Sequence, residues 1–225
     1  MKNEWKAIKT LLQQSCCKKK WLVSAAFICL GIVWKFFSLS GRPEVAEDLS
    51  PLFFAVAGIM PMEILLVNDI SGFVKGSVLR KKIQTTLATK SMFAGTMVAY
   101  LMYLAFLMIL GSVREGQPEV YLRTALVYGV VVCFFGIGNV FLYKFFWAAL
   151  AGIYVICFCV GFAIGIFEDQ IDFAAYWEKL SPVGCVIAAV FLILAGCAIN
   201  LGMTRIFYKR NFSKNAFGAS MRKLV

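Results

Sequence analysis

Apolar residues gather into six long runs along the chain, separated by short polar connections. The runs cover roughly residues 21–39, 49–67, 91–112, 124–142, 145–167 and 183–204. A helix needs about 20 apolar residues to cross the hydrocarbon core of a bilayer, and each run has about that length. The last four runs contain no charged residue. The pattern therefore predicts an all-α integral membrane protein with six transmembrane helices.

Composition agrees with this prediction. Hydrophobic residues make up 61% of the 225 residues, whereas soluble domains contain about 45–50%. The first run is longer than the apolar core of a cleavable signal peptide, about 7–15 residues, and it continues through Trp34, Phe36 and Phe37. We expect it to be a retained transmembrane helix.

The segments that flank the runs have their own patterns. In residues 1–20, Trp5, Ile8 and Leu12 share one helical face, which predicts an amphipathic helix on the membrane surface. The alternative is an unstructured basic tail. Residues 205–225 read as a basic tail, which we expect to be cytoplasmic.

The connection before the sixth run, residues 168–182, is polar but carries aromatic residues. Phe173, Trp177 and Leu180 follow i, i+4, i+7 spacing, so a short helix there would lie in the outer interface. An ordinary loop in the aromatic belt is the equal alternative.

Basic residues are distributed unevenly between the two sides of the predicted spans. Eighteen fall on the side of both termini and four on the other side, with Lys35 inside a span. The positive-inside rule then predicts that both termini are cytoplasmic. The bases are spread over separate connections, so the net charge of +11 reflects topology and attraction to anionic lipid. We expect no nucleic-acid partner.

Several catalytic and cofactor chemistries have no residues to support them. The chain has no histidine, which excludes Ser-His and Cys-His hydrolytic sites and histidine-held zinc or haem. It has no GxxxxGK[ST] phosphate loop and no GxSxG motif. Its eight cysteines include no CxxC pair and avoid the predicted outer connections. We expect neither an enzyme, nor a metal site, nor a cofactor in this chain.

Two charges fall inside predicted spans, where charge is usually functional. Lys35 lies near the outer end of the first span, and we expect its ammonium to reach the interface. Glu63 lies near Pro61 in the inner half of the second span, and we expect the two residues to interrupt this helix, because proline lacks a backbone N–H. Glu63 would line a polar path, pair with a base such as Lys144, or be protonated. With Met60 and Met62 it forms the predicted transport path.

The segment 68–90, NDISGFVKGSVLRKKIQTTLATK, is the longest polar connection between spans. The segment contains one acidic residue, Asp69, and five basic residues: Lys75, Arg80, Lys81, Lys82 and Lys90. We expect this cytoplasmic loop to contain a short helix.

This layout resembles the transmembrane subunits of ABC-2 type exporters, in particular the small bacterial permeases that include the phenol-soluble-modulin exporters. The two share four features: six spans, an amphipathic N-terminal helix, a polar segment after the second span and an outer segment before the sixth. Locally, Asp69, Gly72, Phe73 and Lys90 match the family pattern, with Arg80–Lys82 at its basic centre. The family's turn carries a proline that VLRKK lacks.

The resemblance implies a function and a set of partners. Segment 68–90 would be the coupling element that docks on a separate ATPase subunit. Its residues would be Asp69, Gly72, Phe73, Lys75, Arg80, Lys81 and Lys82. Two ATPase copies would bind the ATP and Mg, and a second permease subunit would complete a homo- or heterodimer. The complex would export a hydrophobic or amphipathic cargo, a peptide or lipid-like compound, across the bacterial plasma membrane.

Two other classes remain open. A substrate-binding membrane subunit of a modular uptake system would need a polar pocket near the outer face, and the spans show no such cluster in sequence. A non-transport protein that confers immunity to a peptide is the third class.

Overall fold

The predicted apolar runs correspond to long helices in the computed structural model, which describes residues 18–40, 48–70, 80–114, 121–167, 179–210 and 213. No strand occurs in these ranges. The helices are α2 (Lys18–Ser40), α3 (Ser50–Ile70), α4 (Arg80–Lys82), the π-helix η3 (Ile83–Leu87), α5 (Ala88–Arg114), α7 (Ala125–Lys144), α8 (Phe146–Phe167) and α10 (Pro182–Phe207).

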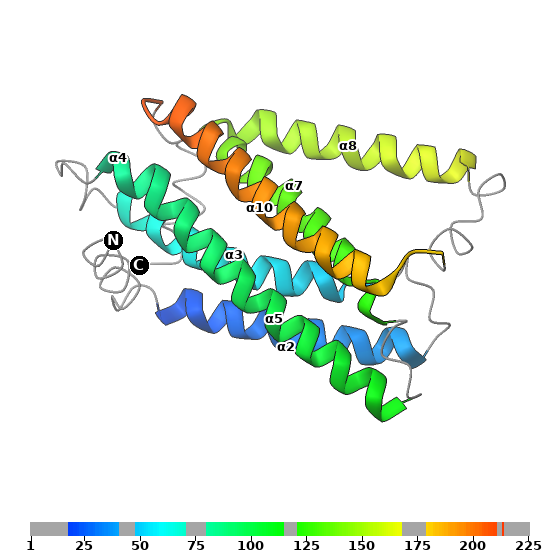
Figure 1. Cartoon of the computed structure of the whole chain (residues 1–225). Helices are drawn as coiled ribbons and strands as arrows, with labels where there is room; N and C mark the ends of the chain where they lie inside the picture. Colours follow the sequence, from blue (N-terminus) through cyan, green and yellow to red (C-terminus); the bar gives the residue numbers. More distant parts are fainter. Residues whose placement is uncertain are drawn as a thin grey trace.

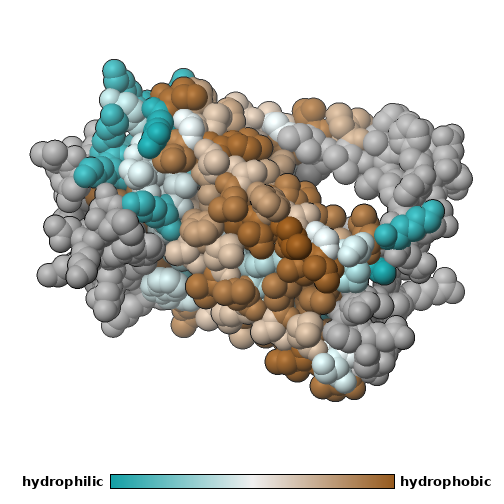
Figure 2. Space-filling model, in the orientation of Figure 1, coloured by the Kyte–Doolittle hydropathy of each residue, from teal (hydrophilic) through white to brown (hydrophobic). Residues whose placement is uncertain are grey.

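Membrane character follows from the length and apolarity of these helices. In the described part of the chain, four are long and apolar enough to cross a membrane: Lys20–Phe37, Ile83–Val113, Ala125–Lys144 and Pro182–Phe207. Ser50–Leu66 and Phe146–Val155 are shorter apolar stretches. Figure 2 shows hydrophilic side chains toward the two ends of the visible face and an apolar belt between them. The all-α membrane fold is thus confirmed, while the count of six spans remains a prediction.

The helices run back and forth between two ends of the bundle (Figure 1). α3 packs along both α2 and α5, and α10 packs along α7. Contacts of α3 with α7 and of α5 with α10 join these groups, whereas the substantial packing of α8, within the described ranges, is on α7. We call one end the basic end, because contacts gather Lys20, Lys81, Lys144 and Arg210 there.

Glycines bring pairs of helices into backbone contact. A Cβ added at Gly136 of α7 would clash with the carbonyl oxygen of Gly196 of α10. A Cβ added at Gly95 of α5 would meet the Pro61 ring of α3 at 2.9 Å and would lie closer still to the backbone of Gly58. Small residues at a crossing permit this approach and are a common basis of helix association in membranes.

A column of aromatic rings fills the centre of the bundle. The ring centroids of Phe54 and Tyr103 are 5.1 Å apart, those of Tyr103 and Tyr128 are 5.9 Å apart, and those of Tyr128 and Tyr100 are 5.2 Å apart. Each hydroxyl is hydrogen-bonded: Tyr128 donates to the Thr96 carbonyl and Tyr100 to the Val186 carbonyl. Buried tyrosines normally need such partners, and here these bonds link α5 to α7 and α10.

Three predicted boundaries change. Lys18–Lys20 belong to the first transmembrane helix rather than to the N-terminal segment, of which residues 1–17 lie outside the described ranges. α3 continues through Pro61, which was expected to interrupt it. Arg205 still belongs to α10, and the tail beyond residue 213 lies outside the description. Only Phe145 separates α7 from α8, which begins at Phe146.

Candidate functional site

The helix that corresponds to the predicted run 91–112 begins well before that run, at the basic end. Arg80–Lys82 are helical and continue through the π-helix η3 into α5. In the family pattern a turn precedes a lysine that opens the third helix, whereas here the described helix already begins at Arg80 and Lys90 lies within it. Leucine, arginine and lysine are good helix formers, and without the family's proline nothing breaks the helix here.

The π-helical segment has a clear hydrogen-bond basis. The backbone N–H of Ala88 bonds to the carbonyl of Ile83, five residues earlier, and also to that of Thr85. The Thr85 hydroxyl donates to the Lys81 carbonyl at 2.7 Å, and Thr89 donates to the Thr85 carbonyl at 3.0 Å. Such segments are rare and often occur at functional sites. Here the segment buries Ile83, Gln84, Thr85 and Leu87, while Lys81 and Lys82 remain exposed.

Beneath these lysines, Lys144 links three helices at the basic end. Its side chain lies at the C-terminal end of α7, and the residue is 8% exposed. The Nζ donates to the side-chain oxygen of Gln84 at 3.2 Å and to the carbonyl of Arg210 at 2.6 Å. The backbone N–H of Ser213 also donates to the Tyr143 carbonyl at 2.9 Å. The start of the third helix, the α7–α8 turn and the end of α10 are thereby joined.

A second polar layer lies deeper in the bundle. Asn200 is completely buried; its Nδ2 donates to the Gly136 carbonyl at 3.0 Å, and its Oδ1 accepts from the Thr89 hydroxyl at 3.1 Å. The Nδ2 of buried Asn139 has no hydrogen-bond partner among the described residues. It lines a cavity of about 20 Å³ together with Gln84, Lys144 and Asn200, which is room for about one water.

The solvent-exposed surface of the basic end is cationic. The Lys81 ammonium lies 4.9 Å from the centroid of the Tyr208 ring, and the Arg210 guanidinium lies 3.9 Å from that of Phe145. Cation–π contacts of this kind hold a charge in place without neutralising it. We define the basic surface as the exposed Lys81, Lys82, Arg205, Lys209 and Arg210.

The other predicted coupling residues are only partly described. Asp69 lies in α3 and Arg80 in α4, with side chains outside the description. Gly72, Phe73 and Lys75 fall in 71–79, also outside it. The structure therefore places Lys81 and Lys82 of this set, and the coupling role of all seven residues remains a prediction.

The predicted path residues lie inside the bundle. Glu63 accepts from Lys20 at 2.9 Å, and both side chains are about a quarter exposed. The expected partner, Lys144, is instead engaged with Gln84 and Arg210. Met60 and Met62 are buried, and Met62 lines the small polar cavity. Their transport role is untested.

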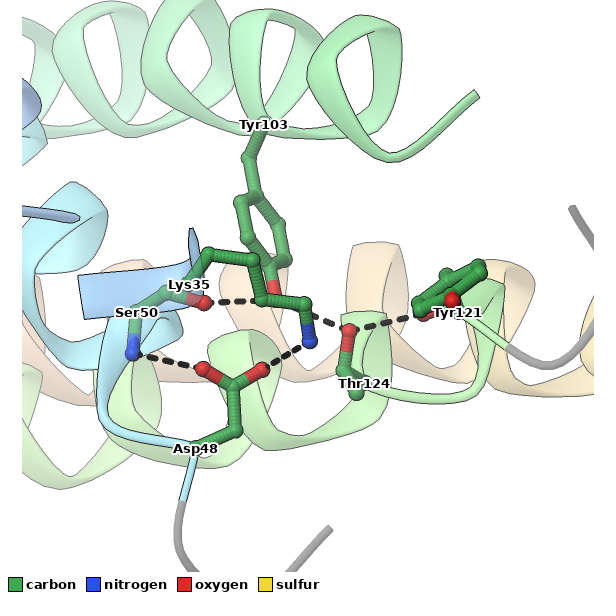
Figure 3. Close-up of polar contacts among 6 residues, drawn as sticks. All are labelled: Lys35, Asp48, Ser50, Tyr103, Tyr121 and Thr124. Atoms are coloured by element: carbon green, nitrogen blue, oxygen red, sulfur yellow. Dashed lines mark hydrogen bonds and ion pairs between the residues drawn. The ribbon is translucent and has the colours of Figure 1, made fainter. Parts of the chain in front are cut away.

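At the opposite end, Lys35 forms a buried ion pair with Asp48 (Figure 3). The two side chains are 6% and 4% exposed, so the Lys35 ammonium is enclosed by the protein and paired with an acid that the sequence did not indicate. The other Asp48 oxygen accepts from the backbone N–H of Ser50 at 3.0 Å and caps the start of α3. An anion at a helix N-terminus is also favoured by the helix dipole.

Neighbouring hydroxyls extend this polar cluster. Tyr103 shares a hydrogen bond with Thr124 at 2.8 Å, and Thr124 donates to the Tyr121 carbonyl at 2.7 Å (Figure 3). Polar groups do converge near this end, contrary to the expectation for the spans. They come from separate parts of the chain and bond to one another, an arrangement that stabilises the bundle rather than opening a binding pocket.

Sequence reasoning missed Gln84, Thr89, Asn139, Lys144 and Asn200 as one polar group. A signal for them existed, because uncharged Asn139 and Asn200 stand inside otherwise apolar runs. Polar side chains in spans usually face the bundle interior. Their grouping depends on how α5, α7 and α10 cross, which one sequence does not show.

Comparison with known proteins adds no identification: the chain matches no family model, no curated protein and no solved structure.

Proposed function

We propose that this chain is the transmembrane permease subunit of an ATP-binding-cassette exporter for hydrophobic or amphipathic cargo. ATP and Mg would be bound by two copies of a separate ATPase subunit. A second permease subunit, identical or different, would complete the complex in a bacterial plasma membrane. The support is the ABC-2-like layout of the sequence together with the geometry of the basic end.

One observation carries the proposal. The helical segment that bears the exposed Lys81 and Lys82 is fixed to the bundle by the hydrogen bond between Gln84 and Lys144. A solvated loop that serves only as a topology determinant does not need a side-chain hydrogen bond to the helix bundle. Here, any displacement of the lysines acts on Gln84 and, through Lys144, on the α7–α8 turn and the carbonyl of Arg210. Energy supplied by a partner at the membrane surface would reach three helices as a rigid-body movement.

Charge indicates what kind of partner surface fits. The basic surface presents cations from two chain segments that lie side by side through the contact of Lys81 with Tyr208. An acidic groove would complement it, speed encounter and fix register. The positive-inside rule predicts that this surface faces the cytoplasm, where ATPase subunits reside.

The test is co-purification of the full chain with an ABC ATPase subunit, which is sought first among the proteins encoded by neighbouring genes. Reversing the charges in Arg80→Glu, Lys81→Glu and Lys82→Glu together is expected to reduce the co-purified ATPase about tenfold or more, because like charges across an interface repel. ATP-dependent export of a labelled amphipathic peptide should fall in parallel.

Lys179→Glu serves as the matched control, since Lys179 is an exposed cation at the opposite end. It should leave both readings unchanged. Retention of full ATPase binding and export by the triple variant would refute the coupling assignment.

A further inference from the structure

A lateral cleft lies between α2, α3 and α5, in the half of the bundle nearer the basic end. Its volume is about 400 Å³, within the range of about 300–1,000 Å³ for small-molecule pockets. Small residues line most of it, including Ala25, Gly58 and Ala94, and Trp21 stands at its basic end.

The helix arrangement explains why the cleft exists and where it stops. α3 packs tightly on α5 through Gly58 and Gly95, so α3 forms the floor. Toward the opposite end α2 meets α5 through the rings of Phe36 and Phe106, whose centroids are 6.2 Å apart. Toward the basic end the two helices diverge, and the gap between them is the cleft.

The cleft opens sideways onto the apolar belt of the protein. Its rim residues Trp21, Val98 and Met102 are between 41% and 59% exposed. In a membrane these side chains face acyl chains, so the occupant reaches the cleft from the bilayer.

The depth of the cleft matches one leaflet. From Ser91 to Met102 along α5 is eleven residues, about 17 Å at 1.5 Å per residue. Half of the hydrocarbon core is about 15 Å thick. An occupant aligned with the cleft would extend from the interface at the basic end to the middle of the bilayer.

The lining of the cleft is polar near the basic end and becomes apolar toward the middle of the bilayer. Ser91, at the basic end, is 2% exposed, and its hydroxyl has no hydrogen-bond partner among the described residues. The Ser24 hydroxyl, by contrast, is used by the Ala57 carbonyl on the floor. The lining residues farther from the basic end, such as Ile28 and Met102, are apolar. An unpartnered hydroxyl in the lining at the basic end, followed by apolar lining toward the middle of the bilayer, suits an ester carbonyl followed by an alkyl chain.

We propose that this cleft binds one acyl chain of a phospholipid from the leaflet at the basic end, with the Ser91 hydroxyl donating to an ester carbonyl and Trp21 at the level of the headgroup. Tryptophan is enriched at that depth in membrane proteins. The proposal does not depend on an ATPase partner, and it holds equally if the chain is not a transporter.

The test uses the full chain in vesicles of phosphatidylethanolamine and phosphatidylglycerol that contain a phospholipid with a photoreactive group in mid-chain. Mass spectrometry of the cross-linked protein should locate the label mainly on Ala25, Ile28 and Met102. Equal labelling of the exposed α10 face around Ile187 and Phe191 would overturn the proposal, because it would mean that lipid merely solvates the protein.

A pair of neighbouring substitutions refines the test. Ala25→Phe should fill the cleft and reduce labelling of Met102 about tenfold. Ala26→Phe adds the same ring at an exposed position outside the cleft and should leave that labelling unchanged. Cross-linking of the cleft to a second chain or to an added apolar peptide, in place of lipid, would also overturn the proposal. The cross-linking sites found on the unsubstituted chain test the proposal even if a variant misfolds.

Discussion

At the scale of single residues, Lys35 with Asp48 is more deeply buried than Lys20 with Glu63, the other ion pair seen in the described part of the chain. Each ion loses most of its hydration, and only their mutual contact and the added hydrogen bond from Ser50 offset that loss. Removing one partner leaves the other charge buried and unpaired, whereas removing both charges does not.

Lys35→Met is therefore expected to lower the free energy of unfolding by about 3 kcal/mol. Asp48→Asn should act similarly, although Asn keeps the helix cap. The double variant should be clearly more stable than the sum of the two losses predicts. Thermal unfolding in detergent, followed by circular dichroism, measures all three.

Lys20→Met provides the comparison for this prediction. Its pair with Glu63 is about a quarter exposed, and such pairs contribute only about 0–1 kcal/mol. A loss at Lys35 no larger than that at Lys20 would contradict the burial argument.

At the scale of elements, α3 stays helical through Pro61 because another helix replaces its missing hydrogen bond. Proline has no N–H, so the carbonyl of Ala57, four residues earlier, loses its usual partner. The Ser24 hydroxyl of α2 donates to that carbonyl at 3.1 Å. Side chains of neighbouring helices often satisfy such groups in membrane proteins.

Ser24→Ala is expected to cost about 1 kcal/mol, because the Ala57 carbonyl then lacks a partner. In a Pro61→Ala background the restored N–H serves that carbonyl, and the same substitution should cost close to nothing. The four unfolding free energies form a double-mutant cycle that isolates the coupling.

Ser112→Ala is the matched control for this cycle. Its hydroxyl donates to Met108 within its own helix, so its effect should be independent of residue 61. Additivity of Ser24→Ala and Pro61→Ala would show that the interhelical bond does not compensate for the proline.

Hydropathy alone predicted the elements closely. The predicted run 183–204 corresponds to Pro182–Phe207, and 124–142 corresponds to Ala125–Lys144. The third helix was the main miss, because hydropathy detects the part of a helix that lies in lipid. Its first turns, from Arg80, carry lysines and so escaped the criterion. Pairings such as Lys35 with Asp48 were also missed, since they depend on how the helices cross.

At the scale of the whole molecule, contacts group the described helix ends at two opposite ends of the bundle. Lys144 meets Arg210 and Lys81 meets Tyr208 at the basic end. At the other end, the Arg123 side chain donates to the Leu180 carbonyl. The structure thus shows the two ends as separate sites of contact. Which end faces the cytoplasm is predicted only from the excess of positive charge.

Site-specific labelling of cysteine tests this orientation. We expect Lys179→Cys to react with a membrane-impermeant maleimide in intact bacterial cells, and Lys82→Cys to react only after the membrane is permeabilised. Both positions are exposed, so access depends on the side of the membrane rather than on burial, and the unsubstituted chain supplies the baseline from its own cysteines. The reverse pattern would place the basic surface outside the cell, out of reach of an ATPase. The coupling proposal would then fail, while the phospholipid cleft would merely move to the other leaflet.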